Sequence, residues 1–382
     1  MESTKKSNID GMLENIPDLL IQSVNKKAEL SYVEGLTPVK GYDFNDGTDY
    51  DKLFDSYKTT GIQATSLSTG IEIINKMISW RLSDEPIKED EDPDLLDPEV
   101  RKNIQCTIFL GYTSNMMSCG MREIIRYLCQ HRMIDCIVTT TGGIEEDFIK
   151  CFSNFFIGDF TLSGSMLRES GINRIGNMLA PNECYTEFEK FFLPLVKEMH
   201  KEQKENGEIF GPSKIINRMG KAINNEESVY YWCWKNNIPV YCPAITDGAI
   251  GDNMFFYNYN EEGFIIDILQ DICSLNKIAL NAHKTGMIIL GGGVIKHHIN
   301  NANMMRDGAD YAVYINTAQE FDCSDSGARP DEAVSWGKIR ADALSVKIYS
   351  EASLVFPIIV AQTFAKYFDL ARKAKDDEKK ES

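Results

Sequence analysis

Short apolar runs recur along this chain from residue 106 onward, and each is followed by a turn of small or polar residues and then by a helical pattern. The runs span residues 106–111, 136–140, 238–242, 287–290 and 311–315. Brief apolar segments that alternate with helical patterns are typical of buried parallel strands joined by crossover helices. The pattern therefore predicts an α/β fold with a Rossmann-like parallel sheet flanked by helices.

The turns that follow the five runs are polar or rich in glycine. They span residues 113–115, 141–143, 246–248, 291–293 and 316–318. In open α/β sheets, ligands bind outside the carboxyl ends of the strands, so we expect these turns to converge on one crevice. The glycine run 291–293 would let a phosphate or a ribose approach the backbone, but it lacks the Gly-x-Gly-x-x-Gly spacing of the dinucleotide fingerprint. The turns predict where a ligand binds and leave its identity open.

Both ends of the chain and one internal stretch lack this pattern. Residues 1–60 mix charged residues with short apolar clusters, and we expect an arm that packs on another surface. Residues 83–99 are crowded with acidic residues and interrupted by prolines, which predicts an exposed loop. Residues 371–382 alternate in charge, as in a frayed helix end or a disordered tail. The α/β domain is therefore expected to span residues 61–370.

Lys338 is the residue with the clearest chemical potential. It ends the run 332–338 behind Trp336, and an amine shielded by aromatic and apolar neighbours loses its proton and attacks electrophilic carbon. The polar stretch 322–332 precedes it and could set several carboxylates around one cation. A lysine that only extends its ammonium group into solvent is the ordinary alternative. An acidic loop that ends in a shielded amine favours a polyamine substrate.

Other side chains could serve such a substrate. His297 and His298 follow the glycine run, and an imidazole there could take a proton from an ammonium group. Three acids could anchor ammonium groups, while Trp336 offers a face for a cation–π contact. These acids are Asp252, Asp325 and Glu332. Each is more often a cap or a solvated charge when taken alone, and only their joint occurrence points to a site.

A second pair of acids follows the predicted strand 136–140. Glu145 and Glu146 could hold a ribose hydroxyl, or they could only cap the helix that begins there. Both interpretations stay open from the residues alone.

Composition narrows the class of protein. The chain has 382 residues and a formal net charge of -17, which argues against nucleic acid as a partner and favours cationic partners, although the charge could serve solubility alone. The ten cysteines form no Cys-x-x-Cys pair, so we expect reduced thiols and no metal site. The amino terminus is polar, and the longest apolar runs fall far short of a membrane span. A soluble, cytoplasmic protein without a membrane partner is expected.

Five segments of the chain strongly resemble deoxyhypusine synthases of the eukaryotic type. They are residues 110–115, 173–177, 286–298, 310–328 and 332–338. The likeness extends over residues 106–368 and includes residues 36–44 in the arm. It implies an NAD-dependent transferase that moves the 4-aminobutyl group of spermidine onto one lysine of the translation initiation factor 5A precursor. Transfer would pass through a covalent imine on Lys338 and release 1,3-diaminopropane, as the first step of hypusine biosynthesis.

The resemblance also implies an assembly and a set of site residues. The family forms homotetramers, dimers of dimers, with active sites between subunits, and the arm covers a neighbouring site. Lys338 would be the covalent nucleophile, and His297 a base or an orienting imidazole. Substrate would be held by Glu145, Glu146, Asp252, Asn301, Ser324, Asp325, Glu332 and Trp336. NAD would be held by Ser114, Asn115, Ser118, Thr140, Thr141, Gly142, Glu146, Asp247, Gly292, Thr317, Ala318, Glu351 and Ala352.

Two departures from the family pattern are mild. Cys323 stands where the animal enzymes have glycine, and Glu351 stands where aspartate is more usual at the cofactor. Neither change removes a catalytic group, but either could tune polyamine affinity or the fit to adenosine.

Three alternatives remain. Homospermidine synthase resembles this family so closely that the same lysine, histidine and acids would serve it, with putrescine as acceptor. A catalytically dead regulatory subunit that needs an active paralogue is the second, and retention of Lys338, His297 and Trp336 argues against it. A simple NAD-dependent amine dehydrogenase would not need the lysine, and it would not release 1,3-diaminopropane.

Overall fold

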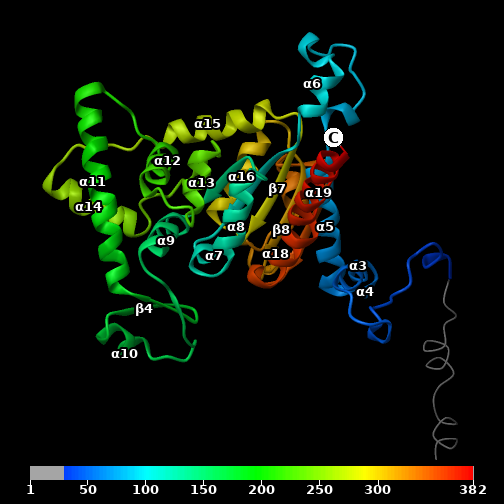
Figure 1. Cartoon of the computed structure of the whole chain (residues 1–382), viewed down its shortest axis with the longest axis horizontal. Coiled ribbons are helices and arrows are strands. Elements are labelled where there is room, and N and C mark those ends of the chain that lie inside the picture. Colours follow the sequence, from blue (N-terminus) through cyan, green and yellow to red (C-terminus); the bar gives the residue numbers. More distant parts are fainter. Residues whose placement is uncertain (1–29, 382) are drawn as a thin grey trace, which may run out of the picture.

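The computed structural model describes residues 30–381, with side chains through residue 373. Its centre is a six-stranded parallel sheet with the strand order β6-β2-β1-β7-β8-β9 (Figure 1). The strands are β1 (Thr107–Tyr112), β2 (Cys136–Thr139), β6 (Val240–Tyr241), β7 (Thr285–Leu290), β8 (Ala309–Asn316) and β9 (Ile339–Tyr349). The predicted Rossmann-like sheet is confirmed, because the five predicted runs coincide with five of these strands and the order is that of doubly wound folds.

The strand order reverses between β1 and β7, which pair in the middle of the sheet. In such folds the ligand crevice opens outside the carboxyl ends of the two strands at this reversal. The turns that leave β1 and β7, residues 113–115 and 291–293, therefore lie where a dinucleotide would be expected.

Helices cover both faces of the sheet, because alternate side chains of each strand point to opposite sides. On one face, Ile288 and Leu290 belong to the apolar cluster formed with α5 (Ile62–Ser79), α8 (Met121–Gln130) and α18 (Ala352–Val360). On the other face, Met287 and Ile289 belong to the cluster formed with α15 (Ile268–Asn281), α16 (Val294–Met304) and α17 (Pro330–Ser335). Every residue of β7 is buried, so the sheet is a rigid platform for the turns at its edge.

A long insertion between β2 and β6 contains a second, three-stranded sheet with the order β3-β5-β4. Its strands are β3 (Phe156–Ile157), β4 (Ile172–Ile175) and β5 (Met178–Pro181), and its helices are α9 (Thr141–Phe152), α10 (Gly164–Glu169), α11 (Asn182–Asn206), α12 (Pro212–Ile223) and α13 (Val229–Lys235). The small sheet and α11 project to the left in Figure 1, and α14 (Ala249–Asn260) packs on α11. Sequence analysis missed these strands because two to four partly exposed residues give no sustained alternation.

Sequence analysis also missed β9, the edge strand that follows Lys338. Its sequence reads as polar because several of its side chains are exposed at the edge of the sheet. The strand begins at Ile339, directly after Lys338. The carbonyl of Lys338 accepts a hydrogen bond from the Ala309 amide at 3.0 Å. The backbone of Lys338 is therefore tied to the amino end of β8.

The segments before β1 are short. Residues 30–60 contain η1 (Leu30–Tyr32), η2 (Phe44–Asp46), α3 (Tyr50–Asp55) and α4 (Tyr57–Thr60), and Asp51 pairs with Lys366 at 3.2 Å. The mostly exposed stretch 83–99 begins within η3 (Leu82–Asp84) and contains η4 (Pro93–Leu95). It ends in α6 (Pro98–Asn103), which leads on to the sheet. The first 29 residues of the expected arm, and Ser382 of the expected tail, lie outside the described residues.

Near its carboxyl end the chain forms one long helix from α18 through a π-helical segment (Ala361–Ala365) into α19 (Lys366–Glu381). By length and composition alone, Ala352–Lys373 is able to cross a membrane. A core helix passes the same test, and here Phe356, Ile359 and Phe364 are buried in the cluster with α5 and α8. One face of α18 and of the π-helical segment therefore packs on the core, while the described residues of α19 are mostly exposed.

Candidate active site

Lys338 lines a pocket of about 470 Å³ on the face of the sheet covered by α16 and α17. We call it the lysine pocket. It is lined by Lys296, His297, Asn300, Asn301, Met304, Cys323, Asp325, Ala328, Arg329, Glu332, Ala333, Trp336 and Lys338. Six of the residues predicted for catalysis or substrate binding therefore share one cavity.

The helical repeat explains how α16 contributes to this pocket. His297, Asn301 and Met304 are spaced by four and three residues, so they share one face of the helix. Its opposite side supplies Ile295 and Ile299 to the apolar cluster beneath the sheet. Helix amphipathicity thus fixes the imidazole over the cavity.

Lys338 is only partly shielded by its own chain. Its ammonium nitrogen lies 5.6 Å from the centroid of the Trp336 ring, which is a cation–π distance. Trp336 itself is 65% exposed, and Glu332 is exposed as well. The predicted aromatic neighbour is present, but the cover that would desolvate the amine is incomplete on one chain.

His297 and Asp325 form the polar pair of the lysine pocket. Nδ1 of His297 lies 3.2 Å from Oδ1 of Asp325, which leaves Nε2 as the imidazole atom able to exchange a proton with a ligand. The second oxygen, Oδ2, is buried and has no hydrogen-bond partner among the described residues. A buried carboxylate oxygen without a donor is an acceptor for a ligand ammonium group.

Two buried lysines that sequence analysis missed hold the loop carrying Asp325. Lys296 donates to the carbonyls of Asp325 and Ala328, and Lys347 donates to those of Ala318 and Gly327. Burial lowers the pKa of both ammonium groups, to about 8 for Lys296. Their partners are backbone atoms 20 to 32 residues away, so no spacing in the sequence could have identified them.

The other predicted polyamine anchors lie in a separate group, which we call the carboxylate cluster. It comprises Glu145 and Glu146 of α9 with Asp247 and Asp252 near the start of α14. No hydrogen bond among the described residues joins this cluster to the lysine pocket, and the two share no lining residue. Ser324 does not line the lysine pocket either; its hydroxyl accepts from the Gly327 amide and shapes the loop.

In the carboxylate cluster Glu145 and Glu146 are buried, whereas Asp247 and Asp252 are exposed. Glu145 accepts from the Ile250 amide at 2.8 Å, and Glu146 accepts from the hydroxyl of Ser118. Burial raises the pKa of both carboxyls, and that of Glu146 reaches about 7. Glu146 is therefore able to carry a proton near neutral pH, and both carboxyls are able to bind a cation.

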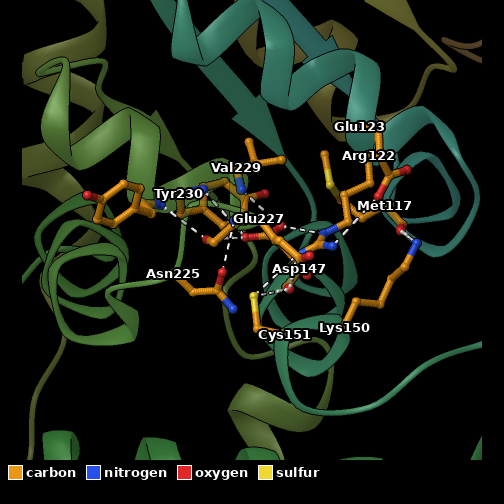
Figure 2. A network of polar contacts seen from close by, with 12 residues as sticks. Met117, Arg122, Glu123, Asp147, Lys150, Cys151, Asn225, Glu227, Val229 and Tyr230 are labelled. Carbon is orange, nitrogen blue, oxygen red and sulfur yellow. Dashed lines mark hydrogen bonds and ion pairs between the residues drawn. The ribbon is translucent and has the colours of Figure 1, made fainter.

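A network of buried polar groups joins α9 to its neighbouring helices (Figure 2). Asp147 accepts from Nε of Arg122 at 2.8 Å, from the hydroxyl of Ser228 at 2.6 Å and from the Val229 amide at 3.0 Å. Because Asp147 is fully buried, this network joins α8, α9 and α13 into one unit. The two acids that precede it on α9 are thereby held in place.

The residues predicted to hold NAD lie in the turns at the carboxyl edge of the sheet or in the helices that begin there. Ser114 and Thr140 bring the turns after β1 and β2 together through a 2.6 Å contact between their hydroxyls. Asn115, Ser118 and Glu351 line a second cavity of about 600 Å³ between α7 (Asn115–Ser118), the start of α18 and the small sheet. Residues that follow β1 and β9 therefore line one cavity.

The local chemistry of this edge suits a dinucleotide. Three helices, α9, α16 and α18, begin here, and no N-cap side chain bonds to their first-turn amides. Free amides at helix starts favour phosphate oxygens. At Gly293, which has a positive φ of 62°, a Cβ atom would meet nothing within 4 Å, whereas at Gly292 it would collide with Ser326. The turn 291–293 thus packs against the loop that contains Ser326 at Gly292 and leaves room for a ligand at Gly293.

The remaining predicted NAD contacts are also at this edge. Thr141 donates to the Ala244 carbonyl at 2.6 Å and thereby joins the turns after β2 and β6, near Asp247. Thr317 and Ala318 follow β8, and Gly142 and Ala352 stand in the first turns of α9 and α18. Among the described residues, no group of three or more His, Cys, Asp or Glu side chains is arranged to hold a metal ion.

Known proteins similar to this chain include deoxyhypusine synthases and a homospermidine synthase. The family model for deoxyhypusine synthase matches residues 52–363. A Dictyostelium discoideum protein named probable deoxyhypusine synthase is 58% identical over 352 residues, which cover 92% of this chain and 93% of that protein. Homospermidine synthase 2 of Senecio vernalis is 52% identical over 342 residues, 88% of this chain and 91% of that protein.

A solved structure agrees with these sequence relatives. The crystal structure of a protein from Entamoeba histolytica assigned as a deoxyhypusine synthase has a TM-score of 0.61 and 35% sequence identity to this chain. The match covers 86% of this chain and 97% of that one. By the family model, by the identity of its relatives and by its fold, this chain belongs to the deoxyhypusine synthase family.

Proposed function

We propose that this transferase moves the 4-aminobutyl group of spermidine, through an imine on Lys338, to one lysine of the translation initiation factor 5A precursor. The observation that carries the proposal is the lysine pocket. In it, Lys338, His297 and the donor-free oxygen of Asp325 meet in one cavity with an aromatic face. A nucleophile, a proton carrier and an ammonium anchor are the groups that such a transfer needs.

Binding of the polyamine follows from the charges around this pocket. Oδ2 of Asp325 and the carboxylate of Glu332 accept hydrogen bonds from the ammonium groups of the substrate. The face of Trp336 packs against the alkyl chain between these ammonium groups. Asn301 adds an amide from the same face of α16. These groups would hold the ammonium groups of the substrate in the cavity that Lys338 lines.

Proton transfer falls to His297 and nucleophilic attack to Lys338. With Nδ1 directed at Asp325, the imidazole takes an ammonium proton at Nε2. The unprotonated Lys338 nitrogen adds to the C=N carbon of oxidised spermidine, and the bond from that carbon to 1,3-diaminopropane breaks. The butyl fragment stays on Lys338 until the acceptor lysine displaces it. NAD, when bound, supplies the oxidation and the final reduction.

We assign NAD to the carboxyl edge of the sheet. Ser114, Asn115, Ser118, Thr140 and Thr141 would hold it on the β1–β2 side, with Gly142, Glu146 and Asp247 beside them. Gly292, Thr317, Ala318, Glu351 and Ala352 would hold it on the β7–β9 side. The uncapped helix starts and the open side of Gly293 support this assignment.

We further propose that a complete site forms between two subunits of a homotetramer in the cytosol. The half-exposed lysine pocket and the separate carboxylate cluster support this, because each lacks what the other supplies. Asp252 and Glu145 of one subunit would face Lys338 of the next.

Homospermidine synthase is the second candidate, and the 52% identity to the Senecio vernalis enzyme is the observation that favours it. Both activities use the same bond cleavage and differ only in the acceptor. An assay of aminobutyl transfer to the precursor protein and to putrescine distinguishes the two activities.

Intact-mass spectrometry tests the covalent step. The protein is incubated with spermidine and NAD, treated with borohydride and compared with Lys338→Ala and with Lys366→Ala, a control on the surface helix α19. We expect an aminobutyl adduct and 1,3-diaminopropane from wild type and control only. Absence of the adduct, with both ligands shown to bind, would refute covalent catalysis by this chain alone and favour a partner-dependent paralogue.

A further inference from the structure

Lys150 makes an unusual set of contacts on α9. Its ammonium nitrogen donates to three successive backbone carbonyls, those of Met117 at 3.1 Å, Ser118 at 3.2 Å and Cys119 at 3.3 Å. A lysine ammonium has three N–H donors, so these bonds use all of them. Figure 2 shows the side chain reaching from α9 to Met117.

The three carbonyls lie at the end of α7, a helix of only four residues. The last carbonyls of a helix have no partner within it, and a cation there stabilises both the orphan groups and the helix dipole. A helix this short has little stability of its own. Lys150 therefore replaces the support that a longer helix would give itself.

A second contact joins the same two helices one turn earlier on α9. The hydroxyl of Ser118 donates to the buried carboxyl of Glu146, which precedes Lys150 by four residues and so shares its face. The end of α7 is thus bonded to α9 both through the side chain of Ser118 and through its backbone carbonyls. Removal of Lys150 would leave the Ser118–Glu146 bond and the Ser114–Thr140 contact at the start of the helix, but no donor to the carbonyls at its end.

The position of α7 matters because the helix begins at the sheet reversal. Asn115 and Ser118, the first and last residues of α7, line the 600 Å³ cavity together with Lys150 and Glu351. Direct contact between Lys150 and a ligand is the competing explanation for its place there. Its three donors are already used, which argues for an indirect role.

We propose that Lys150 is a positioning residue, which holds α7 on α9 so that Asn115 and Ser118 present their side chains to the dinucleotide. The inference rests on the proposed NAD site. It assigns a task to a residue that does not touch the reacting atoms, and it predicts an effect on cofactor binding rather than on the chemical step.

Three variants test this role. Lys150→Met keeps the length of the side chain without donors, and Lys150→Arg restores a charged donor. Lys190→Met, the control, changes an exposed lysine of α11 that pairs with Glu187. We expect the Kd of NAD to rise by about tenfold or more in Lys150→Met, with kcat at saturating NAD within about threefold of wild type. Lys150→Arg should recover part of the affinity, and Lys190→Met should match wild type.

Hydrogen exchange gives a readout that does not depend on activity. Without NAD, amides of residues 115–121 should exchange faster in Lys150→Met than in wild type, while those of β7 stay protected. Unchanged exchange in residues 115–121, or a loss of kcat with unaltered NAD affinity, would overturn the positioning role. If wild type itself failed to bind NAD, the proposed cofactor would be wrong, whereas the exchange result would still decide how α7 is held. If Lys150→Met failed to fold, Lys150→Gln, whose amide keeps two donors, would take its place in both measurements.

Discussion

Asp147 is the buried charge on which the α9 region most depends. Its carboxylate is fully buried and accepts from Arg122, Ser228 and the amide of Val229 (Figure 2). Asp147→Asn would leave the Arg122 side chain, which is only 4% exposed, without its counter-charge. Removing one partner of such a buried pair costs about 3–5 kcal/mol of unfolding free energy, and we expect a loss of that size in urea denaturation.

A matched control for this prediction lies on the same arginine. Glu123 also approaches Arg122, at 3.7 Å, but its side chain is 49% exposed. Exposed pairs contribute about 1 kcal/mol or less, so Glu123→Gln should change the unfolding free energy very little. Similar losses for both variants would show that burial of Asp147 is not the source of the effect.

Glu146 should make stability depend on pH in the opposite sense to an ordinary salt-bridged acid. Burial raises the pKa of its carboxyl from 4.5 in the unfolded chain to about 7 in the folded one. Between about pH 4.5 and about pH 7 the folded state therefore keeps a proton on Glu146 that the unfolded chain has lost. The free energy of unfolding falls as pH rises through this window. The shift corresponds to about 3 kcal/mol in total.

Glu146→Gln removes this titration. The difference in unfolding free energy between the variant and wild type should therefore shift in favour of the variant by about 2–3 kcal/mol from about pH 5 to about pH 8. Urea denaturation at both pH values measures it. Glu189→Gln, at an exposed position of α11, serves as the control. Parallel pH profiles for wild type and Glu146→Gln would contradict a raised pKa at this carboxyl.

At the scale of elements, the loop between β8 and α17 depends on two lysines from other elements. Lys347, in β9, donates to the carbonyls of Ala318 and Gly327 from a position that is 6% exposed. Lys347→Met would leave both carbonyls without this donor, so the loop should loosen and Asp325 should lose its fixed place beside His297. We expect the KM of spermidine to rise by about tenfold and cleavage by a glutamate-specific protease at the exposed Glu320 to quicken.

The control for the loop is Lys366→Met, whose lysine pairs with the exposed Asp51 far along the chain from this segment. It should leave both the protease pattern and the KM unchanged. An unaltered cleavage rate in Lys347→Met would mean that Lys296 alone holds the loop.

The elements differ in how much of them the sequence predicts. Strands β1, β2, β7 and β8 were predictable because burial on both faces makes them continuous apolar runs. The edge strand β9 was not, because one side faces solvent and its apolar positions are interrupted by Arg340, Asp342 and Lys347. The small sheet was missed because its strands have two to four residues. Hydrophobic pattern predicts what the core requires and says little about edges.

The same limit applies to the site. Lys338, His297 and Asp325 could be named as candidates because His297 follows the glycine run and Asp325 lies in the polar stretch that leads to Lys338, but only the structure shows that they share one cavity. Lys296, Lys347 and Lys150 were not, since they bond to backbone carbonyls of distant segments, and any residue there supplies the same carbonyl. Support of this kind is fixed by tertiary structure and leaves no motif.

At the scale of the whole molecule, the division of the site into two groups has a consequence for assembly. The lysine pocket lies on the face covered by α16 and α17, whereas Glu145, Glu146 and Asp252 belong to α9 and α14 of the insertion and its neighbour. Trp336 and His297 remain 65% and 53% exposed on one chain. A second subunit would supply both the missing cover for Lys338 and the missing carboxylates.

Complementation between two defective chains tests this arrangement. Lys338→Ala removes the nucleophile, and Asp252→Asn removes a charge of the carboxylate cluster, so each variant alone should be nearly inactive. If every site combines the lysine pocket of one chain with the carboxylate cluster of another, a mixed dimer regains one intact site of two. Random one-to-one pairing makes half of the dimers mixed, so co-expressed chains should show about a quarter of wild-type 1,3-diaminopropane release. If each chain built its own site, no mixed dimer would hold an intact one, and the co-expressed protein would be as inactive as its parents.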